Sequence, residues 1–309
     1  MSPEDNARPL RLGTRRSVMA MSQSQRVADA ITARTGRPVE LVGVTTHGDV
    51  SKEQLTQIGG TGVFVSALRE RLLDGTVDLA VHSLKDLPTA EPEGIALAAV
   101  PVRDDPRDVL ISAEGRKLAD LPPGARVGTG SPRRVSQLRL LRPDLQYVSI
   151  RGNGDTRIGK VAAGECDAVV LAYAGLDRLG RLDDVSEAFA TDDVLPAPGQ
   201  GALAVECRAD RADLRELLAA VDDPPSRAAV AAERATLATL EGGCHAPIGA
   251  FATHEGARLH LTAVVVADDG AALRMSASGP ASEAAELGRT LAGRMLADGA
   301  ATLMREPER

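Results

Sequence analysis

Short apolar segments alternate with segments of helical periodicity along the first part of the chain. Residues 10–15 (LRLGTR) predict a strand, and residues 17–35 predict a helix directly after it. Apolar residues recur at helical spacing over 62–75, and residues 77–84 (VDLAVHSL) predict a buried strand. Repeats of strand, helix and strand are typical of a parallel sheet with right-handed crossovers.

The same alternation starts again after a break at 101–109, where proline and charged residues cluster and a hinge is expected. Strands are predicted at 125–130 and 145–152, and a helix with Ser131 as its N-cap follows the first of them. The segment 195–207 then crosses back and ends in another strand. The pattern therefore predicts two doubly wound α/β domains.

The C-terminal third lacks this alternation. A helix near 226–240 precedes the glycine-rich segment EGGCHAPIGA, which contains Cys244. A strand at 258–267 and a helix over 282–303 follow. Helices beside strands without the strand–helix–strand repeat predict a small α+β domain at the C-terminus.

Composition and charge narrow the functional classes. The chain of 309 residues is 43% hydrophobic but has no Trp, so aliphatic side chains must build its cores. Its three cysteines are widely spaced and form no CxxC pair, which argues against a disulfide framework and favours the cytoplasm. The sequence has no signal-like apolar core and no run of about 18 apolar residues, so we expect no membrane association. A net charge of −7 argues against nucleic-acid binding.

Glycines, hydroxyls and arginines gather where the predicted strands end. Such residues at helix starts form anion sites from backbone N–H groups and guanidinium forks. One of these sites alone would be weak evidence, since a single arginine is usually solvated or salt-bridged. Four of them in two adjacent domains predict a cleft for a ligand with many carboxylates or phosphates. The segments are 14–17, 82–86, 128–134 and 151–157.

Asp86 places a carboxylate among these cationic segments. It follows an apolar run and stands beside Lys85, so a charged pair that caps the strand is one interpretation. In the other interpretation the carboxylate binds a positively charged or N–H-bearing centre of the ligand. The residues themselves leave both interpretations open.

Cys244 also has more than one interpretation. A cytosolic cysteine is most often a small buried hydrophobe, although the two preceding glycines favour an accessible sulfur. His245 suggests a Cys–His dyad, but no third group is evident to orient it. His47 and His82 do not have metal-site spacing with Cys244, so no metal site is predicted.

Taken together, eight segments resemble the hydroxymethylbilane synthase family, also called porphobilinogen deaminase. They occur in family order between residues 10 and 250. The segments are LRLGTRRS, IGGTGVFVSALRERLLDG, DLAVHSLKDLP, VGTGSPRR, IRGNGDTR, AGLDRLG, LPAPGQGALAVEC and LEGGCHAPIGA. Residues 251–309 match only in general character.

The resemblance implies a transferase of haem and tetrapyrrole biosynthesis. Such an enzyme deaminates four porphobilinogen units, joins them head-to-tail on a covalent dipyrromethane cofactor and releases hydroxymethylbilane. Cys244 matches the cysteine that anchors the cofactor through a thioether, and Asp86 matches the catalytic aspartate. The implied fold has two domains that resemble periplasmic binding proteins and a third that carries the cysteine. We expect these domains at 10–102 with 200–221, at 103–199 and at 222–309.

The resemblance also implies a binding role for the polar residues at the strand ends. Each pyrrole carries an acetate and a propionate, so the growing chain brings many carboxylates to the site. The arginines that match the family's carboxylate-binding residues are Arg15, Arg133, Arg134, Arg151, Arg157 and Arg178. The accessory polar positions are Ser17, Ser83, Lys85, Thr129, Ser131 and Gln200.

Some positions depart from the family pattern. Gln57, Thr61 and Ser66 stand where many relatives have lysine, in the segment expected to form a lid over the site. Asp155 lies beside the arginines of RGNGDTR and is expected either to orient Arg157 or to cap the following helix.

Two other functions compete with the transferase. The two α/β domains also suit a hinged binding protein for a polyanionic small molecule, and Cys244 with His245 would suit a thiol-dependent hydrolase. For the transferase we expect a cytoplasmic monomer that takes porphobilinogen as substrate and hands its product transiently to the next enzyme of the pathway. We expect Cys166 and Cys207 to serve only in packing.

Overall fold

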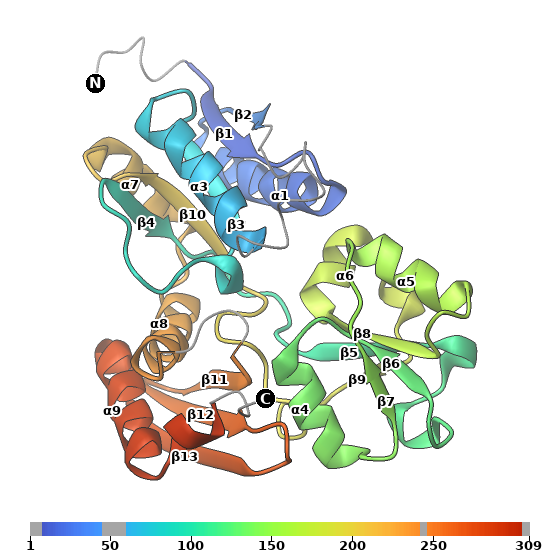
Figure 1. Cartoon of the computed structure of the whole chain (residues 1–309). Helices are drawn as coiled ribbons and strands as arrows, with labels where there is room; N and C mark the ends of the chain where they lie inside the picture. The colour runs from blue at the N-terminus through green and yellow to red at the C-terminus, as the bar shows by residue number, and fades with distance from the viewer. Residues whose placement is uncertain (1–7, 45–59, 242–245, 305–309) are drawn as a thin grey trace. The chain divides into compact units, whose positions relative to one another are not determined.

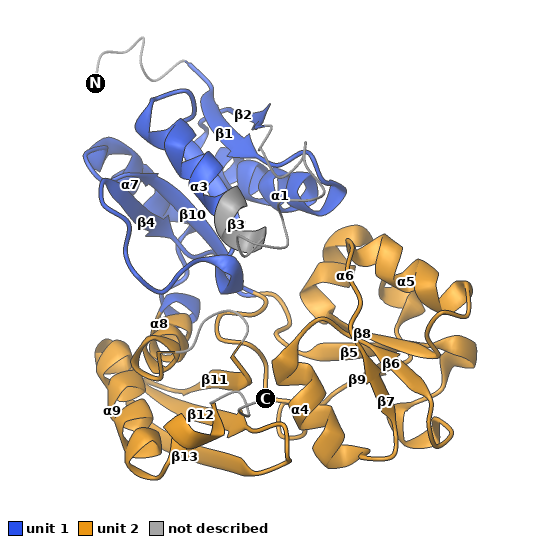
Figure 2. Ribbon diagram, viewed as in Figure 1, with its two compact units in different colours: residues 1–103, 202–227 blue, residues 104–201, 228–309 orange. Residues whose placement is uncertain are grey.

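The computed structural model describes residues 8–44, 60–241 and 246–304 (Figure 1). The chain forms two compact units (Figure 2). Unit 1 comprises Met1–Arg103 and Ala202–Arg227, and unit 2 comprises Asp104–Gly201 and Ala228–Arg309. None of the described helices is long and apolar enough to cross a membrane.

Unit 1 is built on a five-stranded sheet. Its order is β2 (Val39–Gly43), β1 (Leu10–Thr14), β3 (Leu79–Ser83), β10 (Leu203–Arg208) and β4 (Ile95–Ala99). β1 runs parallel to β2 and β3, whereas β10 runs antiparallel to β3 and β4. The helices of this unit are α1 (Val18–Thr35), α3 (Gly60–Leu73) and α7 (Ala212–Leu218).

The first helix has a clear start and end in the sequence. The Ser17 side chain accepts a hydrogen bond from the backbone N–H of Ala20 and so caps α1. Gly36 ends the helix in the left-handed conformation, at φ +71°. The buried face of α1, with Val27 and Ile31, packs against apolar residues of the sheet and of α7. This packing fixes the position of the helix start relative to the strands.

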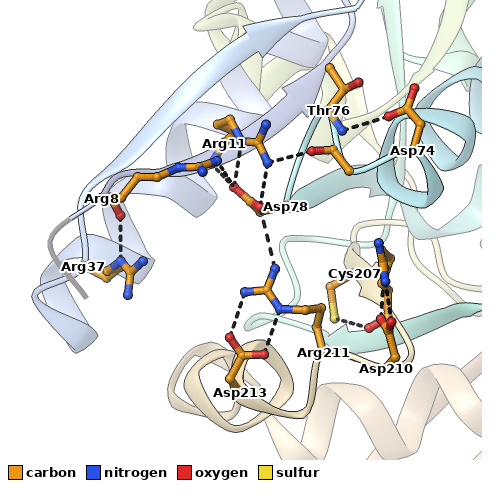
Figure 3. Close-up of polar contacts among 12 residues, drawn as sticks. Arg8, Arg11, Arg37, Asp74, Thr76, Asp78, Cys207, Asp210, Arg211 and Asp213 are labelled. Atoms are coloured by element: carbon orange, nitrogen blue, oxygen red, sulfur yellow. Dashed lines mark hydrogen bonds and ion pairs between the residues drawn. The ribbon is translucent and has the colours of Figure 1, made fainter. Parts of the chain in front are cut away.

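The amino end of β3 in unit 1 is held by a cluster of charges around Asp78 (Figure 3). Arg11 donates three hydrogen bonds to this carboxylate, from its backbone N–H and from its guanidinium. Arg8 and Arg211 lie 3.8 Å from the same side chain. Burial alone would raise the pKa of Asp78, but the hydrogen bonds from Arg11 outweigh it and lower the pKa. The cluster joins β1 to the start of β3.

Unit 2 contains a second five-stranded sheet. Its order is β7 (Gln146–Val148), β6 (Arg126–Gly128), β8 (Ala168–Ala172), β5 (Asp108–Ser112) and β9 (Glu187–Ala188). β6 is parallel to β7 and β8, and β5 is antiparallel to β8 and β9. The associated helices are α4 (Pro132–Leu141), α5 (Gly154–Ala162) and α6 (Tyr173–Leu179). Separate apolar clusters, one with Leu110 and Leu138 and one with Val169 and Ile158, include alternate residues of its strands.

Unit 2 also contains a three-stranded antiparallel sheet in the order β11 (Ile248–Glu255), β12 (Arg258–Val266) and β13 (Ala272–Pro280). Its helices are α8 (Pro224–Thr239), which begins in unit 1, α9 (Ala284–Ala297) and α10 (Ala300–Leu303). A Cβ on Gly288 would lie 2.2 Å from the Ala232 carbonyl oxygen, so glycine lets α9 approach α8 closely.

The expected fold class is confirmed: two doubly wound α/β sheets and a small α+β part. One expectation was wrong, because both large sheets are mixed rather than parallel. β5 and β10 each follow a segment that passes from one unit to the other, so no helical crossover forces them to be parallel to their neighbours. The limits of the three domains stay a prediction.

Candidate active site

The first group of predicted site residues lies at one edge of the unit 1 sheet. β1 and β3 are parallel, so the residues that follow Thr14 and Ser83 come out at the same edge. Gln23 of α1, which is 6% exposed, donates a hydrogen bond from Nε2 to Ser83 Oγ at 3.0 Å. The structure therefore brings Ser17 at the start of α1 and Ser83 at the end of β3 to the same part of unit 1. Gln23 could not be predicted from the sequence, because its partner is 60 residues away.

Asp86 ends the short 3-10 turn Leu84–Asp86 that continues β3. Leu84 and Leu87 are buried on either side of it and hold the turn against the core, while the Asp86 side chain is half-buried. No hydrogen bond or ion pair joins the Asp86 carboxylate to another described residue. Among the described residues, then, Asp86 is not paired with Lys85. A partly buried carboxylate of this kind is available to a cationic or N–H-bearing ligand.

Arg133 and Arg134 have a different environment from the one predicted. Both are buried in the first turn of α4, where they share the carboxylate of Asp108. Arg133 Nη1 lies 2.7 Å from Oδ2, and Arg134 donates from Nε and Nη2 to Oδ1 at 3.0 and 2.7 Å. Arg134 also donates to the Val170 carbonyl, and Arg133 to the Leu195 carbonyl.

Two guanidiniums on one carboxylate leave an excess of positive charge. Burial alone would raise the pKa of Asp108, but the two arginines outweigh it and hold the pKa far below its usual range. The same excess of positive charge affects Arg157. Burial lowers the pKa of its guanidinium, and the positive charge of Arg134 lowers it further. This edge of unit 2 is therefore electropositive and suits carboxylate ligands.

The start of α4 adds further hydrogen-bond donors at this edge. Ser131 is the N-cap residue and Pro132 the first helical residue, as predicted, but the Ser131 side chain makes no capping hydrogen bond. Thr129, which is 1% exposed, accepts a hydrogen bond from the Ser131 backbone N–H. A Cβ on Gly130 would lie 2.9 Å from the Ile150 carbonyl oxygen, so glycine lets this turn lie against the segment after β7.

The segment 151–157 differs from the prediction in one respect. Asn153, not Asp155, caps α5 by accepting a hydrogen bond from the Thr156 backbone N–H. Asp155 pairs instead with Arg181 at 3.0 Å, so both roles expected for Asp155 were wrong. Arg157 donates from Nε to the Gly152 carbonyl. The Arg151 side chain is exposed, and no hydrogen bond or ion pair to another described residue holds it.

Arg178 and Gln200 join two segments of unit 2 that are distant in sequence. Arg178 donates to Asp104 Oδ2 and to the Gly201 carbonyl at 2.9 and 2.8 Å. Gln200 donates to the Pro106 carbonyl and to Asp108 Oδ1 at 2.7 and 2.8 Å. Both side chains are buried and hold the segments 104–108 and 200–201 together.

The predicted cofactor cysteine, Cys244, lies outside the described residues, as do His245 and Gln57. Ser66 of α3 is exposed. Cys166 and Cys207 are buried, and burial raises the pKa of both thiols, that of Cys207 to about 11. Within the described ranges, no group of three or more His, Cys, Asp and Glu residues could hold a metal ion.

Comparison with known proteins gives the family. The family model described as porphobilinogen deaminase, dipyromethane cofactor binding domain, matches residues 10–216, and the model of the porphobilinogen deaminase C-terminal domain matches 228–297. A porphobilinogen deaminase of Thermobifida fusca is 63% identical over 302 residues, which are 94% of each chain. Porphobilinogen deaminase 1 of Streptomyces coelicolor is 58% identical and covers 96% of this chain and 98% of its own. A periplasmic substrate-binding protein from Coxiella burnetii is similar in structure, with a TM-score of 0.44 and 15% identity over 73% of this chain and 96% of its own. The chain therefore belongs to the porphobilinogen deaminase family, as the motifs of its sequence indicated.

Proposed function

We propose that this chain deaminates porphobilinogen and joins four units head-to-tail into hydroxymethylbilane, with Asp86 as its catalytic carboxylate. The single observation that carries the assignment of Asp86 is its half-buried carboxylate at the edge of the unit 1 sheet, which no other described residue pairs. If Asp86 served only to stabilise the fold, we would expect its carboxylate to form an ion pair. The family match at 10–216 supplies the reaction that this carboxylate would serve.

The role of Asp86 follows from the charge that the reaction develops. Loss of ammonia from porphobilinogen leaves an electron-poor pyrrole whose nitrogen shares a positive charge. A carboxylate held in a partly buried turn stabilises this charge more strongly than water does. The same carboxylate can accept the proton that leaves the ring carbon after coupling. Leu84 and Leu87 are buried and fix the turn. The carboxylate therefore does not have to reorganise when the positive charge develops.

The residues at the unit 2 edge fit the family's dipyrromethane cofactor. Its pyrroles carry carboxylate side chains, and this edge offers three arginines against one carboxylate, together with an α4 start that the Ser131 side chain does not cap. When bound, the cofactor supplies the primer on which the product is built. We assign its carboxylates, and those of the porphobilinogen units added to it, to a set of donors in unit 2, and we assign its thioether anchor to Cys244. The donors are Thr129, Ser131, Arg133, Arg134, Arg151 and Arg157.

The polar residues of the unit 1 edge complete the carboxylate-binding set. We assign Arg15, Ser17, Ser83 and Lys85 to the acetate and propionate groups of the cofactor and of porphobilinogen. Ser83 is oriented for this by Gln23, whose donated hydrogen bond leaves the Ser83 hydroxyl proton for a ligand oxygen. We assign Arg178 and Gln200 to the same carboxylate-binding set. Arg178 is held by its hydrogen bond to the Gly201 carbonyl and Gln200 by its hydrogen bond to Asp108.

The domain limits, the cytoplasmic location and the monomeric state belong to the same proposal. Residues 10–102 with 200–221 form the domain that carries Asp86, residues 103–199 the arginine-rich domain, and residues 222–309 the domain that carries Cys244. Product passes transiently to the next enzyme of the pathway.

Intact-protein mass spectrometry tests the proposal together with a porphobilinogen-consumption assay. The purified chain should carry an added mass of two pyrrole units at Cys244 and should convert porphobilinogen into a linear tetrapyrrole. An unmodified chain that consumes no porphobilinogen would overturn the proposal. A chain that binds porphobilinogen without consuming it would be the hinged binding protein.

A further inference from the structure

Asp108 is a carboxylate at the unit 2 edge that the proposed function leaves without a role. It is the first residue of β5 and is 0% exposed. Because β5 runs antiparallel to β8, Asp108 lies opposite Ala172, at the edge where β6, β7 and β8 end. A negative group is therefore buried at the very edge that is expected to bind carboxylates.

The surroundings of Asp108 form a closed set that we call the Asp108 cluster: Asp108, Arg133, Arg134 and Gln200. Oδ2 lies 2.7 Å from Arg133 Nη1, and Oδ1 accepts hydrogen bonds from Arg134 and from Gln200. The exposed fractions of the three partners are 3%, 6% and 1%. Solvent thus has little access to any member. The carboxylate holds the two guanidiniums side by side, and Arg133 is also held by its hydrogen bond to the Leu195 carbonyl.

The Asp108 cluster carries a net charge of one positive unit. Arg133 and Arg134 carry two positive charges, and they occupy the first turn of α4, where the helix dipole already favours anions over cations. Buried charges are costly unless they are paired. Arg133 Nε is buried and makes no hydrogen bond among the described residues. One further carboxylate would balance the charge and supply an acceptor.

We propose that Asp108 is a positioning residue: it holds the guanidiniums of Arg133 and Arg134 next to each other and keeps the net charge of the Asp108 cluster at one positive unit. Without Asp108 the two guanidiniums would repel each other and lose their shared orientation. With a second internal carboxylate the cluster would be neutral and would not attract a ligand. The inference deepens the proposed function and rests on it.

The net charge of the Asp108 cluster predicts that a second substitution can reverse the effect of a first. Arg134 donates three hydrogen bonds, two to Asp108 and one to Val170. Its replacement by Gln removes one positive charge, so the Asp108 cluster becomes neutral and should bind carboxylates more weakly. Removing the Asp108 charge as well, in Asp108→Asn/Arg134→Gln, restores one positive unit on Arg133. A second substitution in a buried site should therefore improve binding, whereas a purely structural Asp108 would make it worse.

The test compares four full-length proteins: wild type, Arg134→Gln, Asp108→Asn/Arg134→Gln and the control Asp167→Asn. Asp167 accepts hydrogen bonds from Arg126 at the opposite edge of the same sheet, so the control changes the same residue type in an ion pair away from the site. Arg134→Gln should raise KM for porphobilinogen about tenfold, the effect of losing one charge-assisted interaction. The double variant should recover most of that loss, while Asp167→Asn should match wild type.

Expressed per molecule that carries the two-pyrrole mass, kcat should change far less than KM in these variants, because Asp86 lies in unit 1 and keeps its turn. A double variant whose KM equals or exceeds that of Arg134→Gln would overturn the proposal, whatever its thermal stability. If Arg134→Gln binds as well as wild type, the charge of the Asp108 cluster does not matter and the proposal also fails. The single variant Asp108→Asn is not needed for either decision, so a failure of that protein to fold leaves the test intact.

A second measurement separates this proposal from the proposed function. If wild type carries no primer and consumes no porphobilinogen, the proposed function fails, and citrate then serves as a tricarboxylate probe. Citrate should raise the Tm of the wild type and of the double variant more than that of Arg134→Gln. Equal shifts in all three proteins would overturn the role of Asp108.

Discussion

Arg69 of α3 donates two hydrogen bonds to the carboxylate of Glu206 in β10, at 3.0 and 2.7 Å. His82 of β3 also lies close to this carboxylate, with Nε2 3.3 Å from Glu206 Oε2. Burial alone would raise the pKa of Glu206, but His82 and Arg69 outweigh it and lower the pKa to about 2. The contact ties α3 to the centre of the unit 1 sheet.

This contact predicts a specific acid sensitivity. Since the folded pKa of Glu206 is depressed, its contribution to stability is fully present above pH 4.5 and is lost as pH falls toward 2. The shift corresponds to about 3 kcal/mol. Glu206→Gln should therefore be less stable than wild type at pH 7 but should lose less stability between pH 5 and 3, measured by urea unfolding. Glu70→Gln, an exposed glutamate on the same helix, is the control. Parallel pH curves for Glu206→Gln and wild type would contradict the prediction.

Asp86→Asn removes the charge of the carboxylate that we propose to be catalytic and keeps its shape. Folding and attachment of the cofactor should be nearly unchanged, because no described residue depends on this carboxylate for an ion pair. Turnover of porphobilinogen should fall by at least about 100-fold, the scale of a lost electrostatic or proton-transfer group. Stopped assays of tetrapyrrole formation measure the loss, with Asp29→Asn on the exposed face of α1 as the control. Turnover near wild type would show that Asp86 is not catalytic.

Asp78 should matter for stability and not for chemistry. Asp78→Asn removes the charge that Arg11 binds from β1 and should cost about 2 kcal/mol of unfolding free energy. Asp74→Asn breaks an exposed pair with Arg71 and should have no measurable effect. Urea denaturation at pH 7 measures both, and kcat per folded molecule should stay at the wild-type value. A loss of kcat in folded Asp78→Asn would place this cluster in the active site after all.

Gly201 is required by the close approach of two backbone segments. It has φ +88°, and a Cβ there would lie 2.5 Å from the Asp104 carbonyl oxygen. Gly201→Ala should therefore cost more than the ~1 kcal/mol of a left-handed alanine alone. Gly180→Ala isolates the backbone cost, because Gly180 has φ +67° with nothing within 4 Å of the added Cβ. Equal unfolding free energies for the two variants would show that the segments 104–108 and 200–201 can separate without loss.

The thiols of Cys166 and Cys207 should be inert in the folded protein. Their burial keeps them protonated and out of reach, and the pKa of Cys207 is raised to about 11. Iodoacetamide at pH 8 should leave both unlabelled in native protein and label both in urea, as read by peptide mass spectrometry. Native labelling of Cys207 at the rate of a free thiol would contradict its assignment to packing.

Some site features could be predicted from the sequence because local patterns encode them. Ser131 before Pro132 indicated a helix start, and the apolar run before Asp86 placed that residue at the end of a strand. Both interpretations needed only neighbouring residues, since strand ends and helix caps are set by local backbone chemistry. The resemblance then gave each of these positions a role.

Other features could not be predicted because their partners are distant in sequence. Arg134 meets Asp108 26 residues away, and Glu206 meets Arg69 137 residues away. Asp155 had two plausible local roles, and the structure gave it neither, because Arg181 comes within 3.0 Å of it. The direction of β5, which places Asp108 at the edge of the site, depends on a chain crossing that no periodicity describes.

The elements, the fold class and the positions where polar residues follow strands could be predicted from the amino-acid sequence, since apolar periodicity and capping act over a few residues. Which charges are already paired depends on how the chain folds. Asp86 is left without an ion pair among the described residues, whereas Arg133 and Arg134 share an internal carboxylate. The energetic effect of a charge depends on its burial and on its partners, and both are set when strands distant in sequence are brought to one edge of a sheet.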